Sequence, residues 1–458
     1  MLNLIRWFPE VTRPTQKFVA FNEKLKWTGI VLIIFFVLNL VPLFGLWQNQ
    51  LKQFELLSVL LGASFGSILS LGIGPIVTAS IVLQLLNGSG LLKFDLTKPE
   101  GKKTFQGVQK LLTIFFVFFE AIVYVVMRGL APSPELVGYK YLLVQIILIA
   151  QLALGGFLII LLDDLVSKWG FGSGVSLFIA AGVAQHLFIR LASPLPSPTN
   201  PELAVGALPA FFQSLAIGDA ISALIMISRI VFTVIIFVIA VYAQSMKVEL
   251  PLSFGVIGGQ ALRWPLAFLY TSNIPVILVA ALFANIQLWA TLLQNWGFPI
   301  LGRFVGNTPV SGLVTLLTPP HIVQKIITGS LTFHDVLTGL VYLSIFILAC
   351  ILFSWLWVNT AGMDAASQAK HIMASGLSMP GFRRDERVLE RVLSRYISAL
   401  TVMGGAAIGI LAGLADISGT LTSGTGLLLT VMIIYRFYEE IVKQHMVDMN
   451  PLLKRFIS

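Results

Sequence analysis

The chain has 458 residues, of which 57% are hydrophobic and only 11% are charged, and its mean hydropathy is +0.89. Soluble domains carry about 25% charged residues, so this composition excludes an ordinary soluble protein and indicates a chain that crosses a membrane repeatedly. Lys and Arg outnumber Asp and Glu by 30 to 21, which gives a net charge of +9. The single cysteine, Cys350, excludes a disulfide within the chain.

Apolar segments of spanning length predict ten transmembrane helices. About 20 apolar residues are needed to cross a hydrocarbon core of roughly 30 Å, and a helix satisfies its own backbone groups there. The first segment is too long for a signal-peptide core and has no clear cleavage site after it, so we expect it to be retained. The ten segments lie at 27 to 47, 75 to 92, 108 to 127, 141 to 163, 174 to 191, 221 to 243, 268 to 291, 336 to 358, 397 to 415 and 424 to 440.

The distribution of basic residues predicts the orientation of these spans. One set of alternate connections and the two ends carry 23 Lys and Arg, the other set carries six, and Arg229 lies inside the sixth span. Cytosolic loops are enriched in Lys and Arg, so we expect both termini in the cytosol. The expected regions are a cytosolic amphipathic arm, a first half, an external hinge loop, a second half and a cytosolic tail, at residues 1–26, 27–191, 192–220, 221–440 and 441–458.

Four connections have patterns of their own. The proline-rich stretch SPLPSPTNPE at 193–202 predicts an extended external loop, and the apolar external region 292–335 is expected to fold back on the membrane edge. The connections 244–267 and 359–396 are expected in the cytosol. In the latter, RDERVLERVLSRY at 384–396 has apolar residues at helical spacing and predicts a short amphipathic helix.

Two of the spans repeat features of two others. GPIVTAS from Gly74 and IPVILVA from Ile274 each have a proline at the start and a branched aliphatic residue two positions later. GSGVSL from Gly172 and GTGLLL from Gly424 form a second pair. The order, second with seventh and fifth with tenth, predicts two halves of five spans. An odd number of spans per half makes the repeats inverted, an architecture that places the working site between the halves.

Few ionisable residues lie where a solute path needs them. Charges at membrane depth are costly and usually functional, but only Glu120 and Arg229 fall well within spans. Others lie near span ends, where we expect snorkelling or interfacial placement: Asp163, Asp164, Lys168 and Asp416. No HExxH, GxSxG, P-loop or paired-cysteine motif occurs. We therefore expect no enzyme, no catalytic residue, no metal and no cofactor; an inverted-repeat secondary transporter of a small solute is the alternative function.

The repeated span starts supply aliphatic side chains instead of charges. Apolar constrictions block ions by excluding water, so a ring of such side chains suits a gate that seals against ions and accepts a large, varied passenger. Packing in an ordinary core is the alternative for each residue. If the four helices meet between the halves, the residues that face one another are Ile73, Val77, Val175, Ile179, Ile277 and Leu429.

Several stretches resemble the SecY family, the protein-conducting channels of the Sec translocon, in their archaeal form. They are LKWTGIVL (25–32), LGIGPIVTASIVLQLL (71–86), SKWGFGSGVSLFIAAGV (167–183), YTSNIPVILVAALFANIQLW (270–289), GFRRDE (381–386) and GTGLLLTVMIIYRFYE (424–439). The resemblance implies an all-α membrane protein with two inverted five-helix halves around an hourglass pore, hinged between the fifth and sixth spans. It implies a channel that passes unfolded chains across the membrane and releases apolar segments sideways into lipid.

The resemblance also implies site residues. The six constriction positions of the family fall on the six aliphatic residues named above. A lateral gate lies between spans two and three on one side and seven and eight on the other, with Thr78, Gln84 and Asn285 as its polar cluster; ordinary helix packing is the alternative for Gln84 and Asn285. A plug precedes the second span and comprises Glu55, Leu56, Leu57, Ser58, Val59, Leu60, Leu61, Gly62, Ala63, Ser64 and Phe65.

Partners follow from the same resemblance. Arg383 of the GFR motif matches the family's ribosome contact, and the adjacent Arg384 adds charge that can meet RNA phosphates. The earlier cytosolic loop retains only Arg263 where relatives carry several basic residues. The implied partners are a SecE-like gamma subunit, a small beta subunit, the ribosome, signal sequences, nascent polypeptides and membrane lipid, but no DNA. The implied location is the cell membrane.

Overall fold

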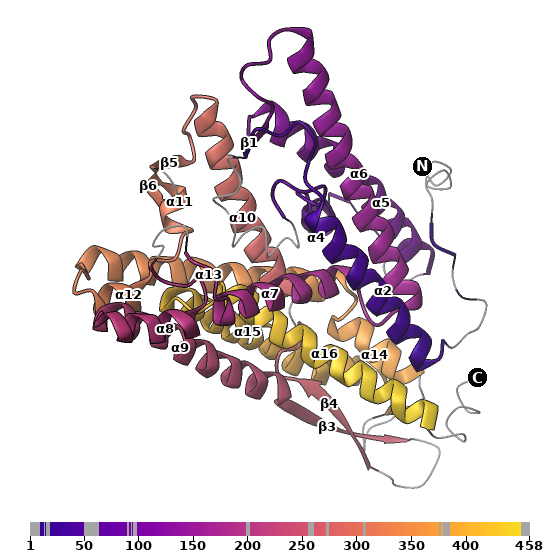
Figure 1. Cartoon of the computed structure of the whole chain (residues 1–458). Helices are drawn as coiled ribbons and strands as arrows, with labels where there is room; N and C mark the ends of the chain where they lie inside the picture. Colours follow the sequence, from indigo (N-terminus) through magenta and orange to yellow (C-terminus); the bar gives the residue numbers. More distant parts are fainter. Residues whose placement is uncertain are drawn as a thin grey trace.

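The protein is predominantly helical, and in the view of Figure 1 some of its helices run steeply while others lie across them. The computed structural model describes residues 10–12, 14, 19–49, 64–88, 91–92, 94, 99–197, 202–254, 261–271, 274–305, 308–374, 377–378 and 385–449. Within these residues a helix occupies each of the ten predicted span positions. Seven of the described helices are long and apolar enough to cross a membrane by length and composition, and α4 is a shorter apolar helix.

The ten helices divide into the two expected sets of five. The first half contains α2 (Phe21–Leu40), α4 (Gly74–Gly88), α5 (Pro99–Val126), α6 (Tyr139–Trp169) and α7 (Gly174–Ala192). A short helix, α8 (Ala207–Ile217), connects the halves. The second half contains α9 (Ala220–Ser245), α10 (Ile274–Asn295), α13 (Phe333–Thr360), α15 (Glu386–Ser418) and α16 (Gly424–Met449).

Two predicted boundaries were wrong. The first span was expected to continue to Trp47, but α2 ends at Leu40, because Pro42 disfavours helical backbone at the residue before it. The backbone then turns to donate from Leu43 N to the carbonyl of Gly66 at 2.9 Å. The seventh span was expected from residue 268, but α10 begins at Ile274, because the preceding residues form a strand.

A small β-structure, absent from the all-α prediction, replaces the expected loop 244–267. Strands β3 (Lys247–Phe254) and β4 (Ala261–Ala267) pair antiparallel, and β7 (Leu377–Ser378) extends the sheet beside β3. Together with α14 (Ala365–Ala374), this sheet packs on the first turns of α15. The buried side chains of this cluster include Leu250, Leu266, Ala369, Leu389 and Leu393.

The predicted short helix at 384–396 is not a separate element. Helix α15 is continuous from Glu386, where the Asp385 carboxylate accepts a hydrogen bond from the backbone N of Arg387 at 3.0 Å. The apolar spacing in this stretch was read correctly, because Leu389 and Leu393 are buried. The helix continues because no proline or loop sequence follows Tyr396 and the apolar residues of the span begin at once.

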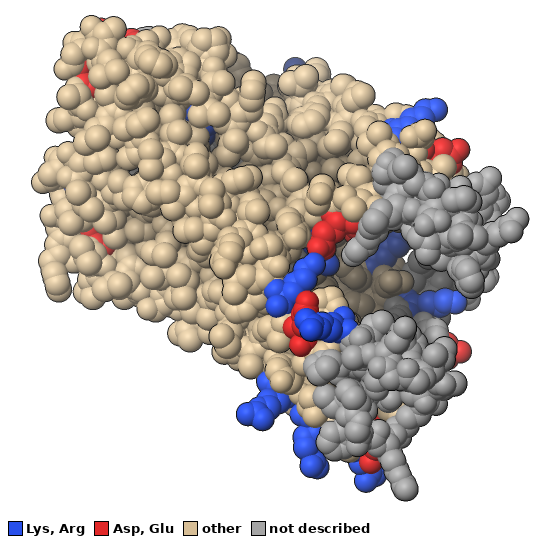
Figure 2. Space-filling model, turned by 90° about the horizontal axis from the view of Figure 1, so that it is seen from below, with Lys and Arg blue, Asp and Glu red and all other residues tan. Residues whose placement is uncertain are grey.

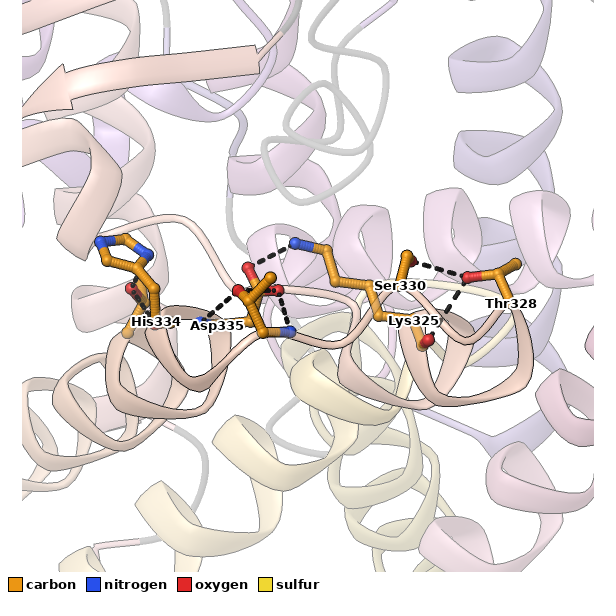
Figure 3. Close-up of polar contacts among 7 residues, drawn as sticks. Lys325, Thr328, Ser330, His334 and Asp335 are labelled. Atoms are coloured by element: carbon orange, nitrogen blue, oxygen red, sulfur yellow. Dashed lines mark hydrogen bonds and ion pairs between the residues drawn. The ribbon is translucent and has the colours of Figure 1, made fainter.

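The opposite end of the bundle carries short elements from region 292–335 and from the first half. Strands β5 (Gly302–Val305) and β6 (Thr308–Gly312) form a hairpin followed by α11 (Leu313–Leu316) and α12 (Ile322–Ile327), and β1 (Gln48–Asn49) pairs with β2 (Leu130–Ala131). Helix α13 begins with a capping box between Thr332 and Asp335, and Asp335 also pairs with Lys325 at 2.6 Å (Figure 3). These contacts fix α12 against the start of α13.

Charged side chains gather at one end of the molecule. In the view from below, Lys, Arg, Asp and Glu lie together at the end near the β3–β4 sheet and the last turns of α16, while the opposite end is almost entirely uncharged (Figure 2). At this charged end the first turn of α2 contacts α16 through a 3.2 Å hydrogen bond from Lys24 Nζ to Gln444 Oε1. The beginning of the first span and the end of the last therefore lie on the same side.

Candidate functional site between the two halves

The six aliphatic residues predicted as a ring lie in one apolar cluster. They come from the starts of four helices, α4 and α7 in the first half and α10 and α16 in the second. Four are buried in this cluster, namely Ile73, Val77, Ile179 and Leu429, and two pack against it while partly buried, Val175 and Ile277. This cluster also contains many other side chains from both halves, so it places the six residues in the shared core of the bundle. Their role as a constriction stays a prediction.

Two aspartates hold the starts of the ring helices. Asp163 of α6 accepts a hydrogen bond from the backbone N of Val175 at 2.9 Å. Asp416 of α15 accepts from the backbone N of Gly424 at 2.6 Å and from the Tyr342 hydroxyl at 2.9 Å. The first N–H groups of a helix have no partner within the helix, and its N-terminus is electropositive, so a carboxylate stabilises both. Each half therefore anchors one ring helix to the helix before it.

Glycine is required at both anchored helix starts. A Cβ on Gly174 would lie 2.6 Å from Asp163 Cα, and a Cβ on Gly424 would lie 2.5 Å from the carbonyl carbon of Ala415. Contacts below 3 Å force the backbone apart, so only glycine permits these approaches. A ring residue follows each glycine five positions later, Ile179 in one half and Leu429 in the other. The two anchors therefore fix the positions of Ile179 and Leu429 at the same distance along their helices from the anchored start.

These aspartates were predicted as snorkelling or interfacial residues near span ends. Asp416 is buried and Asp163 is partly buried, and both bond to backbone. The same anchor occurs once in each half, and it is visible in the sequence as an aspartate at the end of one span and a glycine at the start of the next. The separations differ, however, from 163 to 174 and from 416 to 424, so no fixed spacing linked the two pairs.

Two of the three predicted gate residues meet across the halves. Asn285 Nδ2 of α10 donates to Thr78 Oγ1 of α4 at 3.4 Å. The Thr78 hydroxyl lies 3.1 Å from Glu120 Oε1 of α5, so one polar contact joins three helices. Phe119 stacks on Trp289 beside it, with ring centroids 5.9 Å apart. Glu120 had been noted only as a charge within a span; no local pattern linked it to the gate.

Gln84, the third predicted gate residue, is not part of this contact. Its side chain is buried on α4, and within the described residues its Oε1 has no hydrogen-bond partner. Gln84 lies six residues beyond Thr78 on the same helix, which turns it to another side of the helix. The polar cluster in this structure consists of Thr78, Asn285 and Glu120, and its role in a lateral gate stays a prediction.

The plug prediction falls almost entirely outside the described residues. Of the predicted segment, residues 55–63 are outside them and only Ser64 and Phe65 are inside. The Ser64 carbonyl accepts a hydrogen bond from the Ser67 hydroxyl at 2.8 Å, and the Phe65 ring packs edge-on against Tyr124 at 6.4 Å. The chain leading into α4 is therefore tied to α5.

The predicted docking residues lie at the charged end or outside the described residues. Arg263 is exposed on β4 and pairs with Glu249 of β3 at 2.9 Å, so it stands on the β-hairpin. Arg383 and Arg384 are outside the described residues.

The comparison with protein families agrees with the architecture around this site. A family model described as SecY matches residues 67–438, which include all ten helices except the first and the end of the last. The chain belongs to the SecY family. The match confirms the resemblance drawn from the motifs and covers every predicted ring and gate residue.

Curated SecY relatives match over nearly the full length. The chain is 45% identical to protein translocase subunit SecY of Methanothermobacter thermautotrophicus, with 98% of this chain and 96% of the relative covered. It is 44% identical to protein translocase subunit SecY of Pyrococcus furiosus, with 99% and 98% covered. These relatives are archaeal forms of SecY, as the sequence motifs predicted.

Solved SecY-type structures share the fold. A structure described as a protein-conducting channel has a TM-score of 0.82 and 39% identity, with 98% of each chain covered. Sec61 in the canine ribosome–channel complex from the endoplasmic reticulum has a TM-score of 0.79 and 39% identity, with 98% of this chain and 97% of that chain covered. The predominantly helical SecY channel fold predicted from the sequence is confirmed, with the small β-structure as an addition.

Proposed function

We propose that this SecY-family chain is the channel-forming subunit of a protein translocase. It conducts unfolded polypeptides across the membrane and releases transmembrane segments into lipid between α4 and α5 on one side and α10 and α13 on the other. The observation that carries this proposal is that the six aliphatic side chains, which lie near four helix starts in the two halves, all belong to one apolar cluster. An apolar constriction excludes water and ions without a fixed ligand, which suits a passenger of varied chemistry.

The secondary-transporter alternative is not favoured. The relatives are named as protein translocase subunits. A solute transporter binds its substrate near the midplane with charged or unwound polar groups. Here the carboxylate beside the ring in the second half, Asp416, is already occupied by two backbone N–H groups and the Tyr342 hydroxyl. We propose no catalytic reaction at this site, because the side chains of the proposed ring are aliphatic.

The proposed location is the cell membrane, with both termini in the cytosol. The start of α2 and the end of α16 lie on one side, and that side carries the gathered charges (Figure 2). Lys and Arg are enriched in cytosolic segments near the membrane, so the charged end with the β3–β4 sheet is assigned to the cytosol. The end with α12 and the β5–β6 hairpin is then external.

The proposed gate can be locked by a cross-link between the halves. In the Thr78→Cys, Asn285→Cys double variant the two thiols replace groups 3.4 Å apart, and the only native cysteine, Cys350, is buried. We expect oxidation to abolish translocation of a signal-bearing substrate into proteoliposomes, because the channel opens by separating α4 from α10, and we expect reduction to restore it. The measurement is protease protection of the substrate.

A matched cross-link within one half is the control. The Ser80→Cys, Gln109→Cys pair joins α4 to α5, whose side chains are 2.6 Å apart in the native chain, and both helices belong to the same side of the gate. Oxidation of this pair should leave translocation unchanged. Equal inhibition by both cross-links would contradict the assignment of the gate.

The proposed cytosolic partner is the ribosome, docking through Arg383, Arg384 and Arg263. Support comes from the GFR motif and from the similarity to Sec61 of a ribosome–channel complex. Arg383→Glu should weaken cosedimentation of ribosomes with proteoliposomes and lower the slope of binding against salt by about one unit per lost phosphate contact. Arg303→Glu, on the end assigned as external, is the control and should have no effect. Cosedimentation that is equal in both variants would remove Arg383 from the docking site.

Two small subunits, one similar to SecE and one similar to the beta subunit, are proposed to bind the outside of the helix bundle and hold its two halves together. The support is the apolar outer surface of the helices: α9, for example, exposes Leu224, Val231, Val234, Phe237 and Val238. These residues suit either lipid or a partner helix. Cross-linking followed by mass spectrometry of the purified complex identifies which helices the subunits cover.

A further inference from the structure

The start of α4 is held in a different way from the starts of α7 and α16. Residues 64–73, which lead into α4, form successive turns instead of a helix. The backbone N of Ser67 donates to the Ser64 carbonyl, and the backbone N of Ser70 donates to the Ser67 carbonyl, both at 3.0 Å. Three serines thus recur every three residues, a period that brings side chains to one side of the segment. We call residues 64–70 the serine turn.

Two hydroxyl groups add hydrogen bonds to the serine turn. The Ser67 hydroxyl donates to the Ser64 carbonyl at 2.8 Å and accepts from the backbone N of Leu69 at 3.1 Å. The Ser70 hydroxyl donates to the Ser67 carbonyl at 2.5 Å and accepts from the backbone N of Gly66 at 2.9 Å. Backbone hydrogen bonds with a three-residue period have poorer geometry than those of an α-helix, so runs of such turns are short. The hydroxyls stabilise this run, because each one both donates to and accepts from its backbone.

The serine turn is also tied to the rest of the first half. It pairs with the chain after α2, where Leu43 N donates to the Gly66 carbonyl at 2.9 Å and Ile68 N donates to the Val41 carbonyl at 3.0 Å. The Ile68 carbonyl also lies against the backbone of α6, since a Cβ on Gly155 would be 1.9 Å from its oxygen. Backbone contacts with two other segments therefore hold the serine turn in place.

The serine turn determines where Ile73 lies. Leu69 and Ile73 are buried in the apolar cluster that contains the six proposed ring residues, whereas Leu71 is buried in a second cluster that includes residues of α5 and α6. Between Leu71 and Ile73 the chain turns at Gly72, whose φ of +52° is one that other residues rarely adopt. Ile73 is only three residues beyond Ser70, so a displacement of the turn moves the Ile73 side chain.

We propose that Ser67 and Ser70 are positioning residues of the channel, which hold Ile73 in the constriction and so keep the resting channel closed to ions. The inference rests on the proposed function, because it requires the six aliphatic residues to form the seal. Both serines are buried. A hydroxyl suits this position, because it can donate and accept at once and brings no charge into the apolar core.

The test is the ion conductance of the purified complex in planar bilayers without substrate, together with its midpoint of thermal denaturation. We expect Ser70→Ala to raise the resting conductance about threefold to tenfold, which corresponds to roughly 0.6–1.4 kcal/mol, the net contribution of about one hydrogen bond. Ser70→Thr keeps the hydroxyl and should conduct less than Ser70→Ala. A lower midpoint in Ser70→Ala with the conductance of the native channel would show a structural role only and would overturn the proposal.

A serine on another helix is the matched control. The Ser228 hydroxyl also donates to a carbonyl three residues earlier, that of Ile225 at 2.8 Å, but it lies on α9, which carries none of the six proposed ring residues. Ser228→Ala should leave the resting conductance unchanged. An equal rise in Ser228→Ala and Ser70→Ala would contradict the positioning role.

Double variants show whether Ser70 acts through Ile73. Ser70→Ala should add little conductance to Ile73→Ala, in which the side chain that it positions is already shortened, but it should multiply the conductance of Leu429→Ala. Independent sites add their free energies, whereas residues that act through one another do not. An equal further rise in both backgrounds would overturn the proposal.

The outcomes also separate this proposal from the proposed function. If Leu429→Ala conducts ions and Ser70→Ala does not, the ring assignment holds and the positioning role fails. If neither variant conducts, the ring assignment fails and the positioning role fails with it. If Ser70→Ala does not purify as a monodisperse complex, Ser67→Ala replaces it, with the same expected rise in conductance.

Discussion

Shortening Leu429 to alanine is expected to raise the ion conductance of the resting channel about tenfold or more. The substitution removes three carbons from the proposed ring, each worth about 0.8 kcal/mol of hydration cost, and 1.4 kcal/mol corresponds to a factor of ten. Water and ions then enter the constriction more often, because less apolar surface opposes wetting. The measurement is single-channel and macroscopic conductance of the purified complex in planar bilayers, without substrate.

The adjacent leucine supplies the control. Leu428 is as buried as Leu429 and belongs to the same apolar cluster, but it is not one of the six ring positions. Leu428→Ala creates a comparable cavity and should leave the resting conductance near that of the native channel. Ile73→Ala against Ile81→Ala repeats the comparison at the start of α4 and within it, since Ile73 directly precedes the helix and both side chains are buried. A channel that stays ion-tight in Leu429→Ala and Ile73→Ala would show that the six residues are core packing and no more.

Removing the Asp416 carboxylate is expected to destabilise the second half strongly. Asp416→Ala leaves the Gly424 N–H and the Tyr342 hydroxyl buried without their acceptor. A buried polar group left without a partner costs about 1–3 kcal/mol, so two such groups lower the free energy of unfolding by about 2–6 kcal/mol. The midpoint of thermal denaturation of the purified complex should fall. The resting conductance should rise too, because Leu429 follows the anchored turn of α16.

Three variants calibrate this result. Tyr342→Phe removes one donor and leaves Asp416 with its two backbone partners, so its effect should be smaller. Asp416→Asn keeps one acceptor oxygen and should also lie between the native chain and Asp416→Ala. Asp219→Ala removes a similar cap, an aspartate that accepts from Ser222 N at 3.1 Å, but at an exposed helix start where water replaces it. Equal destabilisation in Asp219→Ala and Asp416→Ala would show that burial of the Asp416 anchor contributes nothing.

Span positions and the pairing of halves could be predicted because they depend on local composition. Apolar length, the basic residues of alternate loops and the proline or glycine at span starts are all visible in one dimension. Ile73, Val77, Ile277 and Leu429 could be proposed for the ring because each lies near such a start and matches a constriction position of the family. The predicted span boundaries were wrong where another local feature prevents a helix. Pro42 ends α2 early, and the pairing of β3 with β4 delays the start of α10.

The anchors and the completed gate could not be predicted in the same way. Glu120 reaches Thr78 across 42 positions and Asn285 reaches it across 207, so the cluster exists only when three helices pack together. Asp163 and Asp416 read as interfacial residues because sequence places them at span ends but gives no depth. Their burial depends on the re-entry of the next helix at a glycine, which brings backbone N–H groups to the carboxylate.

Periodicity, length and charge are properties of the chain, so they were enough to predict a polytopic helical protein with two related halves. Which polar groups are satisfied depends on the packing of the helices, because hydrogen bonds need the right distance and direction between segments far apart in the chain. That packing alone joins Arg190 of the first half to Arg229 and His321 of the second around one cavity. The free-energy cost of placing the Arg229 charge within a span can be judged only once the groups around its side chain are known.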